Sequence, residues 1–289
     1  MKRIAILLAI IAVLSLTGCI TFLTQINVRG DGSGTMVQTI TMNPEQIKES
    51  MEGIAKQMGA TTAETKEASV NKSSKASGES PFKESDLKGK VADLGTGVTF
   101  LSAEEIDTKT AAGVRVTYAF KDINQLTVNP KPAAAMGTEG AGASSKDALK
   151  FRFSRKPNGN AVLTVVLPPP EPEADNEQPA ATPPVSPEEP AQNMAIMMMQ
   201  MFKGLHMGMA IDVGGKIVKT NSPYVEGSKV TLMDIDFDPL LSDAKGFKAL
   251  SEKMEKAKAD DRKTMEALKG IKGLKITTDQ EISIEFTPQ

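Results

Sequence analysis

The chain has 289 residues, with 34 lysines and arginines against 36 aspartates and glutamates, and a formal net charge of −2 at pH 7. A mildly acidic chain without a basic patch argues against binding to nucleic acid. The single cysteine, Cys19, excludes an internal disulfide, and the single histidine, His206, leaves little material for a zinc site or a Ser-His-Asp arrangement.

The first residues of the chain have the pattern of a secretory signal. Residues 1–3 are basic, and residues 4–16 form an apolar run without charge. This run is shorter than the roughly 18 apolar residues that a membrane-spanning helix requires. A signal anchor or an ordinary secreted precursor is therefore a weaker alternative.

The residues that follow, Leu16-Thr17-Gly18-Cys19, resemble the lipobox of bacterial lipoproteins. That resemblance implies that residues 1–18 are a signal peptide that is removed. It also implies that Cys19 is diacylated on sulfur, and that the chain is anchored to the extracytoplasmic side of a membrane. Ile20 follows the cysteine, which resembles the pattern sorted to the outer membrane in a cell with two membranes.

Three polar segments interrupt the chain. Residues 60–80 and 130–145 are small, polar and without periodicity, and residues 168–192 are rich in proline and acidic side chains. Such segments cannot bury enough apolar surface to offset the entropy of ordering, so we expect disordered insertions. We therefore expect one folded domain in two parts, residues 19–167 and residues 193–289.

The first part begins with a predicted β-hairpin. Residues 21–29 and 35–42 alternate between apolar and polar, and the glycine-rich residues 30–34 between them favour a turn. Asn43 and Pro44 are typical of a helix start, and an apolar stripe at helical spacing follows them. A second helix is predicted to begin near Pro81 and to run toward residue 95.

The next segments are mostly strands. Residues 98–101 and 114–120 have strand patterns, and residues 122–126 favour a short helix. Residues 149–155 and 161–167 flank Asn158-Gly159, a dipeptide typical of a tight hairpin turn.

In the second part, the sequence predicts helices over residues 193–205 and 244–269. It predicts strands over residues 207–213, 216–219 and 229–237, and a last strand around Ile282, Ile284 and Phe286. Because regular strand–helix alternation is absent, we expect the α+β class, with an antiparallel sheet and helices packed on one side of it.

Methionines form the least usual local feature. Met194, Met198 and Met201 share one face of the predicted helix with Leu205. Packing in a core is the favoured interpretation. An apolar ligand or partner surface and a Cu(I) site of thioether ligands are the alternatives.

Little else in the sequence points to chemistry. We interpret His206 as a structural residue, and Asp234, Asp236 and Asp238 as a solvated strand face in preference to a calcium site. The sequence therefore predicts no catalytic residue, no metal and no cofactor.

Residues 211–237 are similar to a pattern of strands and glycine turns in LppM-type envelope lipoproteins. The resemblance implies a non-enzymatic envelope lipoprotein that contacts lipids. We accordingly expect a membrane-anchored binding or structural module whose partner is an apolar ligand or an envelope protein. A hydrolase without a recognisable motif and a methionine-based Cu(I) protein are the alternatives.

Overall fold

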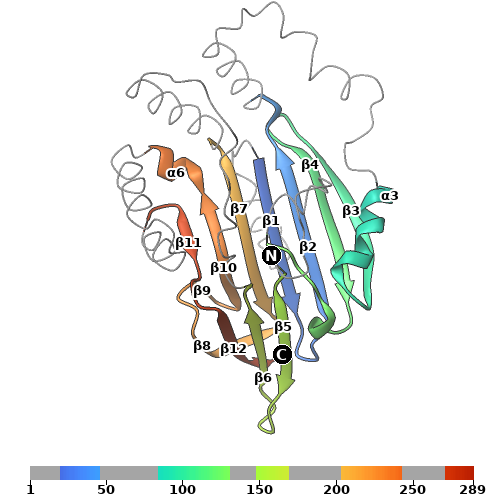
Figure 1. The fold of residues 1–289 in the computed structure, drawn as a ribbon, viewed down its shortest axis with the longest axis vertical. Coiled ribbons are helices and arrows are strands. Elements are labelled where there is room, and N and C mark those ends of the chain that lie inside the picture. Colours follow the sequence, from blue (N-terminus) through green and yellow to red (C-terminus); the bar gives the residue numbers. More distant parts are fainter. Residues whose placement is uncertain (1–19, 46–83, 131–147, 169–202, 243–270) are drawn as a thin grey trace, which may run out of the picture.

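The computed structural model describes residues 20–45, 84–130, 148–168, 203–242 and 271–289. These residues form two β-sheets, a larger one of eight strands and a smaller one of four (Figure 1). Within them, no helix has the length and apolar character needed to cross a bilayer.

The larger sheet takes strands from most of the chain. Its order is β11-β10-β7-β1-β2-β4-β3, and β9 pairs with β10. All its pairs are antiparallel except β1 with β7, which run in parallel. The strands are β1 (Ile20–Val28), β2 (Gly34–Met42), β3 (Val98–Asp107), β4 (Ala112–Phe120), β7 (Leu205–Val213), β9 (Val225–Glu226), β10 (Lys229–Asp236) and β11 (Leu274–Ile276).

The smaller sheet is antiparallel, in the order β5-β6-β12-β8. Its strands are β5 (Lys150–Arg155), β6 (Ala161–Val166), β8 (Gly215–Thr220) and β12 (Glu281–Pro288). The chain passes from the larger to the smaller sheet at Gly214 and Gly215. A Cβ on Gly215 would lie 2.1 Å from the carbonyl oxygen of Thr287, so only glycine allows this close approach.

Helices are short in the described part of the chain. They are α3 (Glu84–Gly89) and α6 (Phe237–Ser242), together with the 3₁₀ turns η2 (Lys90–Leu94) and η3 (Ile123–Gln125). Buried Leu87 of α3 belongs to the main core, and its carbonyl oxygen accepts a hydrogen bond of 3.3 Å from the hydroxyl of Tyr118.

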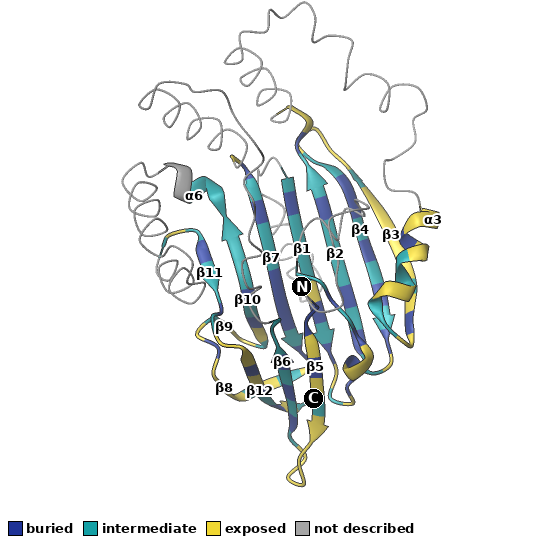
Figure 2. Ribbon diagram, viewed as in Figure 1, coloured by how far each residue is buried: buried dark blue, intermediate teal, exposed yellow. Residues whose placement is uncertain are grey.

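The core lies between the two sheets, at one end of the larger one. We call the end of the larger sheet that holds Ile20 and Leu205 the proximal end, and the end that holds Val28 and Val213 the distal end. Figure 1 shows the smaller sheet against the distal end, and Figure 2 shows buried residues alternating along the strands there. Fully buried side chains of both sheets form one cluster that includes Ile26, Met36, Tyr118, Ile211, Leu163, Ile282, Ile284 and Phe286.

The predicted fold class is wrong. A second sheet, and not a layer of helices, covers the larger sheet at its distal end, and β1 and β7 break the expected antiparallel order. The strands of the smaller sheet were each predicted correctly. Alternation identifies the inward face of a strand, but it does not identify the strand's neighbours or the layer that covers it.

Several local predictions are confirmed. β1 and β2 form the first hairpin, β5 and β6 form the second, and the Asn43 side chain accepts a hydrogen bond of 3.1 Å from the backbone N–H of Glu45. The helices predicted over residues 47–58 and 244–269 lie outside the described residues, as do the three predicted insertions except for Pro130 and Pro168. The helix predicted over residues 193–205 lies outside them up to residue 202, but its predicted end is wrong, because residues 203 and 204 form a turn and Leu205 begins β7. The division into two parts therefore remains a prediction.

Candidate functional site

A groove crosses the face of the larger sheet that points away from the core. Along β7, Met209 and Ile211 face inward, and His206, Gly208 and Ala210 face outward between β1 and β10. The groove has a volume of about 560 Å³ and is lined by residues of β1, β7, β10 and β11. This volume falls within the range of roughly 300–1,000 Å³ that is usual for small-molecule sites.

Small residues on a central strand create this groove. Gly208 lies between Leu23 on β1 and Asp234 on β10, and Ala210 lies between Gln25 and Thr231. A Cβ on Gly208 would lie 2.7 Å from a methyl carbon of Leu23, so the Leu23 side chain occupies the space above the glycine. The floor is therefore apolar, with the Leu23 side chain over Gly208, and longer side chains of the neighbouring strands form the walls.

His206 and Asp234 form the proximal wall of the groove. Nε2 of His206 lies 2.7 Å from Oδ1 of Asp234 and bridges β7 to β10. His206 is only 8% exposed. The hydrogen bond from His206 is the main cause that lowers the pKa of Asp234, so this carboxylate is ionised.

The second ring nitrogen of His206 is buried without a partner. Nδ1 is the one buried side-chain nitrogen or oxygen in the described part of the chain that makes no hydrogen bond. When Nε2–H donates to Asp234, Nδ1 of the neutral ring is an acceptor that lacks a donor. A buried polar atom in this state costs free energy, because its lost contact with water is not replaced.

The three aspartates around the end of β10 do not converge on one point. Asp234 is bonded to His206. Oδ1 of Asp236 accepts from the backbone N–H of Asp238 at 3.1 Å, and Oδ1 of Asp238 accepts from the N–H of Gly204 at 2.6 Å. Asp238 also lies in α6 and not on the strand. Their bonds are therefore structural ones, and no group of three metal-ligating side chains gathers within the described ranges.

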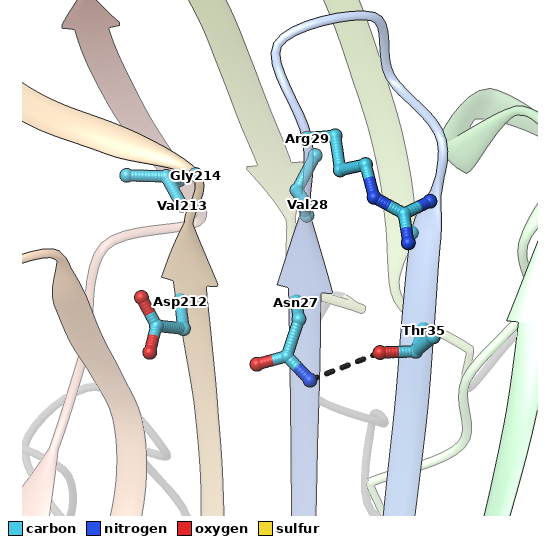
Figure 3. Close-up of a pocket in the computed structure, with 8 residues that line it drawn as sticks. Asn27, Val28, Arg29, Thr35, Asp212, Val213 and Gly214 are labelled. Atoms are coloured by element: carbon cyan, nitrogen blue, oxygen red, sulfur yellow. Dashed lines mark hydrogen bonds between the residues drawn. The ribbon is translucent and has the colours of Figure 1, made fainter. Parts of the chain in front are cut away.

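Toward the distal end of the same sheet lies a small pocket of about 140 Å³, lined by residues that include Asn27, Arg29, Thr35 and Asp212 (Figure 3). Nδ2 of Asn27 donates to the hydroxyl of Thr35 at 3.1 Å, and Oδ1 of Asn27 accepts from Gln25 at 2.8 Å. Asp212 lies beside Asn27 on the neighbouring strand. Its carboxylate makes no hydrogen bond and no ion pair within the described residues.

This arrangement is better suited to binding than to acid–base catalysis. Of the two nitrogens of His206, one is engaged by Asp234 and the other is buried, so neither is placed to take a proton from a bound substrate. A general acid would need a raised pKa, whereas the pKa of Asp234 is lowered.

The site residues predicted from the sequence are mostly different from the residues that line the groove. Cys19, the predicted lipidation site, lies outside the described residues, as do Met194, Met198 and Met201. The structural interpretation of His206 did not anticipate the groove. A usable signal was present, because Gly208 and Ala210 fall on the outer face of a strand, and glycine within a strand often marks a close approach of another group.

Comparisons with known proteins add little. No protein-family model matches the chain, and no curated protein matches its sequence. The solution structure of the folded domain of LppM from Mycobacterium tuberculosis aligns with a TM-score of 0.29 and 10% identity, over 76% of this chain and 83% of that domain. This is a weak likeness to a protein of the type that residues 211–237 resemble.

Proposed function

We propose that this chain is a lipid-anchored, extracytoplasmic protein of a bacterial envelope that binds an apolar or amphiphilic molecule in the groove over β7. The observation that carries the proposal is the groove itself. Its apolar floor at Gly208 and Ala210 lies beside the hydrogen-bonded pair of His206 and Asp234. Apolar lining with a few fixed polar groups is the usual character of a small-molecule site.

The position of β1 supports a site close to the membrane. β1 begins at Ile20, directly after the predicted lipidation site Cys19, and the N–H of Ile20 donates to the carbonyl oxygen of Gly204 at 3.1 Å. The groove extends from the level of Thr21 to that of Gln25. At about 3.3 Å per strand residue, it would lie roughly 7–20 Å from an acyl chain on Cys19.

The groove also favours a binding protein over the hydrolase alternative. A hydrolase built on His206 would need a ring nitrogen that the substrate can reach, and the bond to Asp234 and the burial of Nδ1 leave none. The proposal therefore assigns His206 the role of fixing the groove wall through its bond to Asp234.

A variant that fills the groove tests this proposal. The mature chain carrying Cys19→Ser would be titrated with oleate and followed by native mass spectrometry, with and without Ala210→Leu. Because the larger side chain occupies the floor, we expect affinity to fall by about tenfold or more, a loss of about 1.4 kcal/mol. Ala119→Leu, on the same face of the larger sheet but on β4, is the matched control and should bind oleate as the parent does.

Two results would contradict the proposal. Absence of oleate binding by the parent protein would remove the evidence for an apolar ligand. Equal binding by the Ala210→Leu variant, with an unchanged circular dichroism spectrum, would show that any ligand binds elsewhere.

A further inference from the structure

We propose that the distal end of the groove, where Lys229 of β10 lies opposite Asp212 of β7, is its headgroup subsite and binds a zwitterionic phosphoethanolamine group. In this arrangement Asp212 receives the ammonium and Lys229 receives the phosphate. The inference rests on the proposed function, because it assumes that the groove holds the acyl chain of the same molecule.

The charges at this end of the groove are placed in a row across the sheet. Asp212 on β7 lies directly opposite Lys229 on β10, and Lys229 lines the groove. No ion pair joins the two side chains within the described structure, although both belong to one face of the sheet. A ligand that carries an anion and a cation in the matching order would neutralise both residues.

The spacing of the row agrees with the proposed headgroup. Neighbouring strands lie about 4.8 Å apart, which sets the lateral separation of Lys229 and Asp212. Phosphate and ammonium are separated by two carbons in phosphoethanolamine, so their charges have a similar separation. The Asp212 carboxylate points away from Asn27 and Thr35, toward the side of β7 on which β10 lies (Figure 3).

The direction of the groove fits a lipid taken from the anchoring leaflet. In that leaflet headgroups point outward, away from the hydrocarbon. A lipid that leaves the membrane and enters the groove can keep its orientation. Its acyl chain would then lie near His206 at the proximal end, and its headgroup near Asp212 at the distal end. These two residues are six positions apart, or about 20 Å along the strand. That length compares with a hydrocarbon thickness of roughly 15 Å for one leaflet, half of a 30 Å core.

The test compares probes that share one oleoyl chain. The mature chain with Cys19→Ser would be titrated by native mass spectrometry with oleoyl lysophosphatidylethanolamine, oleoyl lysophosphatidylglycerol, oleate and free phosphoethanolamine. We expect a preference of about tenfold for the ethanolamine lipid over the glycerol lipid. Asp212→Asn should reduce this preference to about one while leaving oleate binding unchanged. Asp107→Asn, the same change on β3, should retain the preference.

The outcomes separate this inference from the proposed function. If oleate binds but the two lysolipids bind equally, or if Asp212→Asn keeps the preference, the proposed headgroup subsite is contradicted. The proposal that the groove binds an acyl chain is then unaffected. If no acyl probe binds, the proposed function itself fails. If free phosphoethanolamine binds as tightly as its lysolipid, the subsite recognises a soluble compound, and a lipid source is overturned.

Discussion

The packing of the two sheets is tested most sharply at Phe286. This residue lies on β12, the strand that pairs with both β6 and β8, and its side chain is 0% exposed within the main core. Phe286→Ala would leave a cavity between the sheets. Truncation of a buried phenylalanine costs about 3–5 kcal/mol, a large share of a domain's usual 5–15 kcal/mol.

Urea denaturation of the mature chain carrying Cys19→Ser measures this loss directly. Calorimetry should show a fall in Tm of about 6–20 °C, since each kcal/mol shifts the Tm of a domain of 150–250 residues by roughly 2–4 °C. Val218→Ala is the matched control. Val218 belongs to the same small sheet, but its side chain faces solvent at 57% exposure, so we expect a change within about 0.5 kcal/mol.

The reasoning would be refuted by a small effect at Phe286. A loss below about 1 kcal/mol, comparable with that of Val218→Ala, would mean that the smaller sheet does not supply the core of the larger one. Two separate unfolding transitions, with only one of them shifted by Phe286→Ala, would show that the sheets fold as independent units.

Three further predictions concern two glycines and the His206–Asp234 pair. Gly34→Ala should destabilise the protein by about 3 kcal/mol or more, because the added Cβ would lie 1.9 Å from the carbonyl oxygen of Asn27. By contrast, Gly89→Ala meets no atom within 4 Å and should stabilise α3 by about 0.5–1 kcal/mol in the same urea assay. A neutral Gly34→Ala would contradict the strand register. The pKa of Asp234 is lowered in the folded state, chiefly by the hydrogen bond from His206, so its contribution to stability is present above about pH 4 and is lost as the pH falls below that value. Denaturation between pH 5 and pH 3 should therefore show a smaller loss for Asp234→Asn than for the parent, and parallel losses would count against the His206–Asp234 bond.

The sequence was most informative where local chemistry decides the structure. Alternation together with Gly30–Gly34 was sufficient for the first hairpin, and Asn158-Gly159 was sufficient for the second, because tight turns require particular residues. The Asn43-Pro44 pattern likewise predicted a capping residue, and the Asn43 side chain accepts a hydrogen bond from the N–H of Glu45. These features depend on residues that are close in the chain.

The sequence was least informative where distant segments meet. No pattern in residues 21–29 shows that β1 pairs in parallel with β7, almost two hundred positions later, and the short strand β11 (Leu274–Ile276) was not predicted at all. The groove depends on this pairing, because Gly208 forms a floor only when Leu23 and Asp234 flank it. Whether a second sheet or a layer of helices covers the larger sheet also depends on contacts between residues that are far apart in the chain.

The central claim is that a lipid on Cys19, directly before β1, attaches the protein to a membrane and so brings the groove close to that membrane. Metabolic labelling with an alkyne analogue of palmitate, followed by isolation of the protein, tests this claim most directly. We expect strong label on the parent protein and none on a Cys19→Ala variant expressed at a similar level. An unlabelled parent protein, or label retained by Cys19→Ala, would contradict the account.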